Sequence, residues 1–276
     1  MAACGDDRAT TDGQDTTGDG IHDGTVPDGF GVVQRYPNMN LFVPGEVRLP
    51  VSITDGQNIL PKGPAVLTGW VETFDGERVA EVSAPRRSDG IEIPYWEVRV
   101  QLDRAVIHTL RFEGDDGYGA TFEVWDPADA AAPRLGEAFP PFDTPTVDDH
   151  RGVEPFCSLT PEPCPFHTLT LTEALASGRP TVYVVGTPAH CSTGTCAPGL
   201  QLLIAENSRL SGVANVVHAD VYADDAATEI SPAVNALGIQ YEPVVYLIGA
   251  DGVLVDRLDA VWDAGELAAR IDLLLA

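Results

Sequence analysis

The fold of this chain is decided around one stretch, Thr181-Val-Tyr-Val-Val-Gly-Thr-Pro-Ala-His-Cys191-Ser-Thr-Gly-Thr-Cys196-Ala-Pro-Gly199. Its first five residues are typical of a strand buried in a parallel or mixed sheet, and a loop with two cysteines follows. Behind the second cysteine, the apolar spacing predicts a helix. A thiol at a helix N-terminus faces unsatisfied N–H groups and the positive end of the helix dipole, and both stabilise its thiolate. We therefore predict a reactive Cys191/Cys196 pair.

Strand and helix signals also alternate on both sides of this stretch, over residues 157–276. The predicted elements are, in chain order, a strand Thr168–Leu171, a helix Glu173–Ser177, a strand Thr181–Val185, a helix marked by Leu200, Leu203, Ile204 and Leu210, a strand Val213–Val221, a helix Ala226–Leu237, strands Val244–Ile248 and Val253–Leu258, and a helix Ala264–Leu275. Thr170-Leu-Thr-Glu173 matches a capping box at the start of the first helix. The order β-α-β-α-β-α-β-β-α indicates an α/β domain.

A second informative segment is Leu237-Gly-Ile-Gln-Tyr-Glu-Pro243-Val-Val-Tyr-Leu-Ile248. Together with the element order, it resembles thioredoxin-like proteins, in which a helix end, Gly-Ile, a short bend and a cis proline precede an apolar strand. The resemblance implies a thioredoxin-like fold for residues 157–276, with Pro243 as the cis proline that faces the cysteine pair. Cis peptide bonds are nearly confined to X-Pro, which also favours Pro243.

The loop that opens this region contains two further cysteines, in Cys157-x6-Cys164-Pro-Phe-His167. With the Thr-Pro-Ala-His-Cys-x4-Cys motif that follows, it resembles thioredoxin-domain lipoproteins of the actinobacterial type, a resemblance that spans residues 30–276. The segment between Cys157 and Cys164 is short, polar and rich in proline, which favours a structural disulfide over a redox pair.

The roles of the two central thiols follow from exposure. We favour Cys191 as the nucleophile and Cys196 as the resolving thiol, because the attacking sulfur should be the more exposed one. The motif Cys196-Ala-Pro-Gly resembles the Cys-Gly-Pro-Cys of thioredoxins without its second cysteine, so the reverse order stays open. The preceding strand has no acidic residue, which leaves proton handling to His190 or water. The residues predicted to shape the catalytic and substrate groove are His190, Pro243, Glu242, Thr187 and Pro188.

Residues 30–126 show a β pattern with period two. The predicted strands include Val47–Ile53, Val66–Phe74, Arg78–Ser83, Glu97–Leu102, Ile107–Phe112 and Ala120–Val124. Asp75-Gly76 is a two-residue hairpin signal. About seven short strands over about a hundred residues indicate an all-β immunoglobulin-like sandwich. Residues 127–156 are rich in proline, alanine and aspartate and are predicted to be a linker.

The N-terminus and the charge bear on localisation. Met1-Ala-Ala-Cys4 is similar to the end of a bacterial lipobox, so we expect a lipid anchor at Cys4 and an extracytoplasmic protein on the outer face of the cell membrane. Residues 1–29 would form that anchor and a disordered acidic tether. The net charge of −26 argues against nucleic acid as a partner. Paired cysteines also suit an oxidising compartment.

These features predict a membrane-anchored thiol–disulfide oxidoreductase that acts on exported protein thiols and disulfides or on a redox partner. One alternative is a non-enzymatic, lipid-anchored binding or scaffold protein with structural disulfides. Another is a copper-handling protein similar to the Sco family, with His190, His167 or His218 beside the thiols. A peroxidase is disfavoured, because its signature requires Pro and Thr where this chain has Val184 and Pro188. We predict no cofactor and no resident metal.

Overall fold

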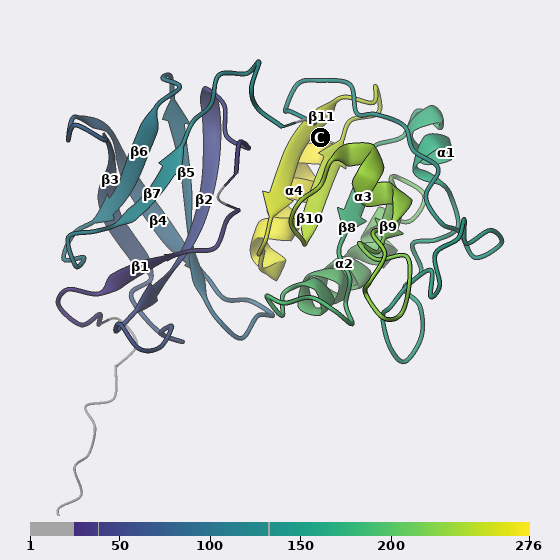
Figure 1. Ribbon diagram of the computed structural model, residues 1–276, viewed down its shortest axis with the longest axis horizontal. Helices are drawn as coiled ribbons and strands as arrows, with labels where there is room; N and C mark the ends of the chain where they lie inside the picture. Colours follow the sequence, from purple (N-terminus) through teal and green to yellow (C-terminus); the bar gives the residue numbers. More distant parts are fainter. Residues whose placement is uncertain (1–24, 38, 132) are drawn as a thin grey trace, which may run out of the picture.

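Two β-sheets lie side by side in the computed structural model, which describes residues 25–37, 39–131 and 133–276 (Figure 1). The predicted lipid anchor at Cys4 and nearly all of the predicted tether fall outside those residues. Within them, no helix is both long and apolar enough to cross a membrane.

The N-terminal unit is a single antiparallel sheet that curves until its two edges nearly meet. Its strands are β1 (Gly31–Gln34), β2 (Gly45–Thr54), β3 (Val66–Thr73), β4 (Arg78–Arg87), β5 (Tyr95–Leu102), β6 (Ile107–Phe112) and β7 (Ala120–Glu123), in the spatial order β1-β2-β5-β4-β3-β6-β7. The edges approach each other where Phe30 bridges to Asp115. They also approach where the Gln34 side chain donates to the Thr121 carbonyl.

The prediction of an immunoglobulin-like sandwich is wrong, because the strands form one continuous sheet and not two sheets packed face to face. β4 is the strand that joins the two halves. It pairs with β3 over most of its length, and its last two residues, Arg86 and Arg87, pair with β5. The hairpin turn at Asp75-Gly76 is confirmed, since Gly76 has a φ of 85° and its N–H bonds to the Thr73 carbonyl.

The C-terminal unit is a four-stranded mixed sheet between helices. Its strands are β8 (Thr181–Val185), β9 (Asn215–Ala219), β10 (Val244–Ile248) and β11 (Leu254–Asp259), in the order β11-β10-β8-β9, and its helices are α1 (Leu171–Ala176), α2 (Cys196–Leu210), α3 (Pro232–Leu237) and α4 (Ala264–Leu275). Only β8 and β9 run parallel among these described strands. Alternate residues of β8 face two cores, since Val182 and Val184 share one with α2 and α4, and Tyr183 and Val185 share the other with α1 and α3.

The prediction of a thioredoxin-like α/β fold for this unit is also wrong. The expected first strand does not form, because Thr170 is already the N-cap of α1, in the predicted capping box with Glu173. The predicted order therefore loses its first element, and α1 and α3 are only six residues long. The result is a small mixed sheet with few helices.

The helix predicted from Ala226 begins later, at Pro232, for a local reason. Asp224 accepts hydrogen bonds from the backbone N–H groups of Thr228 and Glu229, which hold this segment in a turn. Pro232 then occupies the first helical position, where its missing N–H costs nothing.

Part of the predicted proline-rich linker is packed against the second sheet. Residues 136–139 run beside β11, where Gly136 and Phe139 donate to carbonyls and Glu137 accepts from Leu254. The Phe139 ring lies 4.9 Å from the ring of Tyr246, between centroids. This segment therefore belongs to the core of the second unit.

Arg48 of β2 joins the two units. Its guanidinium makes two hydrogen bonds of 2.6 Å to the two carboxylate oxygens of Glu266 in α4. It also donates to the carbonyls of Asp259 and Val261, and the Tyr95 hydroxyl donates to Glu266. The side chains of Arg48 and Glu266 are 5% and 1% exposed. Burial disfavours the Glu266 carboxylate, but its interactions with Arg48, the Tyr95 hydroxyl and Arg99 together outweigh burial and lower the pKa of Glu266 to about 2.

Replacing Arg48 with methionine should lower the free energy of unfolding by about 3–5 kcal/mol, because it leaves the Glu266 carboxylate buried without its partner. The double variant Arg48→Met/Glu266→Leu should lose much less than the sum of its single changes, since no buried charge is left uncompensated. Urea unfolding of the four proteins at neutral pH measures this coupling, and additive losses would contradict it.

The same pair should make stability depend on acid pH. The pKa of Glu266 is about 2 in the folded protein against an ordinary value of 4.5, so its stabilisation is complete above pH 4.5 and is lost as the pH falls towards 2. Over that window, the wild type should lose about 3 kcal/mol more than the double variant. Equal losses in the two proteins would show that the pair does not contribute.

Candidate functional site

Cys191 and Cys196 form a disulfide at the start of α2. Cys196 is the first residue of the helix and is 2% exposed, whereas Cys191 lies in the preceding loop and is half-buried. The backbone N–H of Cys196 donates to Cys191 Sγ at 3.2 Å, and the Thr193 hydroxyl lies 3.2 Å from the same sulfur. The loop therefore leaves Cys191 partly exposed and places its sulfur against the first N–H of the helix.

The residues predicted to line a groove are partly assembled around this disulfide. The Glu242–Pro243 peptide bond is cis, as the sequence predicts. The backbone N–H of Thr187 donates to the Glu242 carboxylate at 2.5 Å, and one carboxylate oxygen lies within 4.8 Å of both sulfurs. Burial raises the pKa of Glu242. Glu242 is therefore a titratable carboxyl group beside the disulfide, whereas the sequence predicted only a groove residue there.

His190 and Pro188 lie on the same loop but form no hydrogen bond with the disulfide among the described residues. His190 is exposed, and its ring packs edge-on against Tyr222, with 6.0 Å between the ring centroids. Pro188 is half-buried at the start of the same loop. Among the described residues, no hydrogen bond joins His190 to either sulfur, so the predicted proton-handling role gains no geometric support.

Three hollows border the loop that contains Cys191, which we call the disulfide loop, and Thr193 lines all three. The first is formed by this loop, α2 and part of the first unit, and its residues are Arg35, Ile91, Glu92, Ile93, Thr193, Gly194, Thr195, Pro198, Gly199, Val261 and Trp262. The second, towards α3, is lined by Ser192, Thr193, Val221, Tyr222, Ile230, Val234, Ile239, Gln240, Tyr241 and Glu242. The third shares Arg35, Tyr241 and Glu242 with these two. The loop therefore forms a ridge between the first two hollows.

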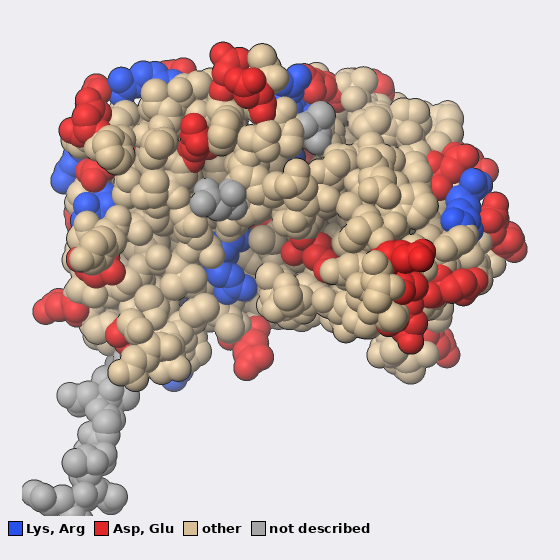
Figure 2. Space-filling model, viewed as in Figure 1, with Lys and Arg blue, Asp and Glu red and all other residues tan. Residues whose placement is uncertain are grey.

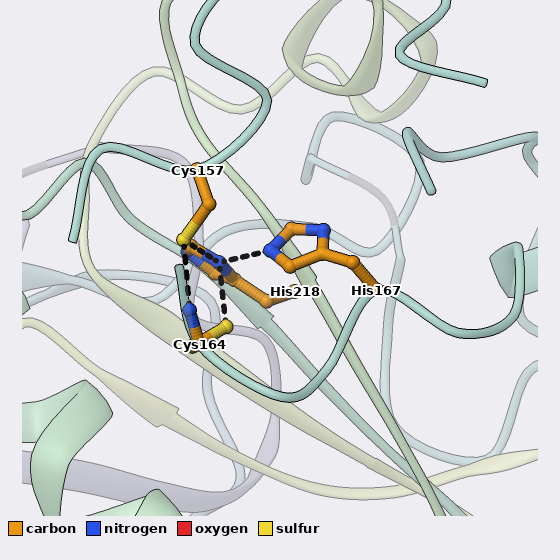
Figure 3. A group of neighbouring side chains, drawn as sticks. All are labelled: Cys157, Cys164, His167 and His218. Atoms are coloured by element: carbon orange, nitrogen blue, oxygen red, sulfur yellow. Dashed lines mark hydrogen bonds between the residues drawn. The ribbon is translucent and has the colours of Figure 1, made fainter. Parts of the chain in front are cut away.

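A second cysteine and histidine cluster lies buried behind this loop (Figure 3). It consists of Cys157, Cys164, His167 and His218, whose ligand atoms all lie within 4.8 Å of one another. His218 Nδ1 is 3.7 Å from Cys157 Sγ, 3.4 Å from Cys164 Sγ and 3.1 Å from His167 Nε2. None of the four residues is more than 4% exposed.

The outer nitrogens of both histidines are held by backbone carbonyls. His167 Nδ1 lies 3.3 Å from the Pro145 carbonyl, and His218 Nε2 lies 2.9 Å from the Gly186 carbonyl. A carbonyl oxygen can only accept, so these two nitrogens carry the protons of the neutral rings. The inner nitrogens therefore turn their lone pairs towards each other and towards the thiols.

The protonation states in this cluster are strongly perturbed. A hydrogen bond from Cys164 lowers the pKa of the Cys157 thiol, and the neighbouring histidines act in the same direction. Burial opposes a charge on His218, but its interactions with Cys157 and Asp220 outweigh burial and raise its pKa to about 9. The other thiol shifts in the opposite direction, because its hydrogen bond with Cys157 and its burial raise the pKa of Cys164.

This cluster corrects the sequence analysis. The expected disulfide between Cys157 and Cys164 is not formed, since both residues are free thiols. The copper hypothesis named His167 and His218 but paired them with Cys191 and Cys196, whose sulfurs are bonded to each other. The spacing Cys-x6-Cys-x2-His is a usable signal for metal ligands, but His167 lies in a loop, and His218 lies 51 residues further along the chain on β9.

Comparisons with models of known protein families and with curated proteins find no match for this chain. The predicted membership of the thioredoxin-like lipoproteins accordingly gains no support from them. A function is therefore argued from the geometry of the two cysteine sites.

The two cysteine pairs should respond differently to thiol reagents. In a Cys4→Ser background, the protein denatured without a reductant should release free thiols at Cys157 and Cys164 only, while Cys191 and Cys196 stay linked. Alkylation followed by peptide mass spectrometry measures this directly. A peptide linked through Cys157 and Cys164 would contradict the assignment.

Proposed function

We propose that this protein exchanges thiols and disulfides with a protein partner through Cys191 and Cys196. The observation that supports the proposal is the position of the disulfide, with a half-exposed Cys191 on a ridge between two hollows and a buried Cys196 behind it. A disulfide that only stiffened the loop would need neither an accessible sulfur nor a groove beside it.

The reaction follows from the difference in exposure. In the reduced protein, the Cys191 thiolate attacks one sulfur of a partner disulfide, a new S–S bond forms, and the other partner sulfur leaves as a thiolate that takes up a proton. The Cys196 thiolate then attacks Cys191 and releases the second partner thiol. The partner gains two electrons, and the Cys191–Cys196 disulfide is restored. In the reverse direction, a partner thiolate attacks Cys191 of the oxidised protein.

The surroundings of the two sulfurs fit these roles. The Cys196 N–H and the Thr193 hydroxyl are positioned to donate to a Cys191 thiolate, which stabilises negative charge on the attacking sulfur. Glu242 is the nearest described carboxyl group, and its raised pKa suits a group that takes a proton from Cys196 and returns it.

The surface suits an extended peptide with little negative charge. On the face shown in Figure 2, acidic side chains are numerous over the C-terminal unit and along the upper edge, and a few acidic and basic side chains lie near the middle among uncharged ones. The hollows beside the loop are lined mainly by apolar and hydroxyl side chains. A partner segment around a cysteine would therefore bind through apolar contacts on both sides of the ridge.

A Cys196→Ser variant should form a stable mixed disulfide with glutathione at Cys191, because the sulfur that would release it is gone. The matched variant Cys191→Ser should react at least about tenfold more slowly, because Cys196 is buried. Both are measured in the Cys4→Ser background by mass spectrometry of intact protein over time.

Faster reaction of the Cys191→Ser variant would reverse the assigned order of the two thiols. If the wild-type disulfide and both variants stay inert towards glutathione in the folded protein, the exchange proposal fails.

A further inference from the structure

The geometry points to a tetrahedral zinc centre formed by Cys157, Cys164, His167 and His218. This inference goes beyond the proposed exchange function and does not depend on it, because the two sites have no cysteine in common. It rests on the spacing of the four ligand atoms, on the hydrogen bonds behind them and on the burial of the cluster.

The spacing of the ligand atoms matches a zinc coordination sphere. With Zn–S bonds of about 2.3 Å and Zn–N bonds of about 2.0–2.1 Å, a tetrahedron has edges of about 3.5 Å between S and N and about 3.3 Å between two N atoms. The corresponding S–N distances here are 3.7 and 3.4 Å, and the N–N distance is 3.1 Å. The three edges that meet at His218 Nδ1 therefore match a shared zinc ion to within a few tenths of an ångström, and the other three edges are no longer than 4.8 Å.

The hydrogen bonds behind the histidines orient both rings for a metal. Metal-bound histidines usually donate their other N–H to a carbonyl or carboxylate, which fixes the ring and its tautomer. Pro145 and Gly186 supply such carbonyls, and Asp220 Oδ1 lies 3.4 Å from His218 Nε2. Without a cation, two lone pairs would face each other at 3.1 Å in a site closed to water.

One sulfur atom has a backbone donor of its own. The Cys164 N–H donates to Cys157 Sγ at 3.4 Å. Such a donor stabilises a thiolate, which is the form that binds metal. Two thiolates and two neutral imidazoles balance the charge of Zn²⁺, whereas Cu⁺ would leave a net negative charge in a fully buried site.

The four protein ligands and their burial indicate a structural centre. A catalytic zinc keeps an open position for water or substrate, and here all four positions are taken by side chains. The ion would tie the 157–167 loop to β9, and through His218 it would hold the Gly186 carbonyl. Gly186 lies at the start of the disulfide loop and close to the disulfide itself, since a Cβ built on it would sit 3.6 Å from Cys196 Sγ. The centre therefore supports the backbone under the disulfide.

The test is the metal content of untagged full-length protein, purified without chelators and measured by inductively coupled plasma mass spectrometry. We expect about one zinc per chain. Cys164→Ser should lower the zinc content more than tenfold, because three ligands remain. The matched control is Cys191→Ser/Cys196→Ser, which removes the other cysteine pair and should retain the metal. His190→Asn, a change at an exposed histidine, should retain it as well.

Because Cys164→Ser can fail to fold without its metal, a second measurement uses the wild type. The metal is removed with a chelator and the protein is titrated with Co²⁺. The inference predicts the intense visible bands of tetrahedral Co²⁺ with a thiolate charge-transfer band, an end point near one ion per chain, and displacement by Zn²⁺.

Each outcome decides the question. Stoichiometric zinc that survives in Cys191→Ser/Cys196→Ser supports the centre, as does a tetrahedral cobalt spectrum in the same variant. Metal lost from that variant but kept by Cys164→Ser overturns the ligand assignment. Stoichiometric copper in place of zinc overturns the choice of ion. Absence of both bound metal and the cobalt spectrum overturns the centre itself. Glutathione exchange at Cys191 stays a separate readout, so failure of one proposal leaves the other testable.

Discussion

The contacts of the His218 imidazole link the two cysteine sites. Its Nε2 donates to the Gly186 carbonyl, at the point where β8 ends and the disulfide loop begins. Its Nδ1 faces two thiols and a second imidazole in a site closed to water. The carbonyl fixes the tautomer and turns the lone pair of Nδ1 inward, where a proton donor or a metal ion can engage it. Of these, only a metal ion engages all four groups at once.

The first sheet contributes to the same region from the other side. The backbone N–H groups of Ser88 and Asp89 donate to the Asp263 carboxylate, which also caps α4. This contact brings residues 91–93 beside the disulfide loop, where they line one of its two hollows. The N-terminal unit therefore supplies a wall of the candidate groove, and the buried Arg48–Glu266 pair holds that wall in place.

Local signals in the sequence predict the turns and caps correctly, whereas the assembly of the strands into sheets does not follow from them. The capping box at Thr170, the turn at Gly76 and the cis bond before Pro243 each depend on a few neighbouring residues, and all three are present. The fold class of each unit depends on which strands pair. Pairing in β4 is decided by its last two residues, Arg86 and Arg87, whose contact with β5 converts two expected sheets into one. Period-two patterns give no information on such a junction.

In the candidate site, too, the features set by neighbouring residues can be predicted from the sequence, whereas those set by tertiary packing cannot. Cys191 and Cys196 were found because a buried strand, a loop and a helix follow one another directly along the chain. Glu242 was placed beside them by register, but its burial and raised pKa depend on how β10 packs against β8. His218 is an alternating residue of an apolar strand, so only the tertiary structure shows that it meets Cys157, Cys164 and His167.

The most direct test of this account is the equilibrium reduction potential of the Cys191–Cys196 pair against glutathione, measured in the folded full-length protein. An accessible pair that exchanges with partners should have a potential of about −120 to −270 mV. A pair that stays oxidised below about −300 mV would be a structural disulfide and would contradict the proposed function.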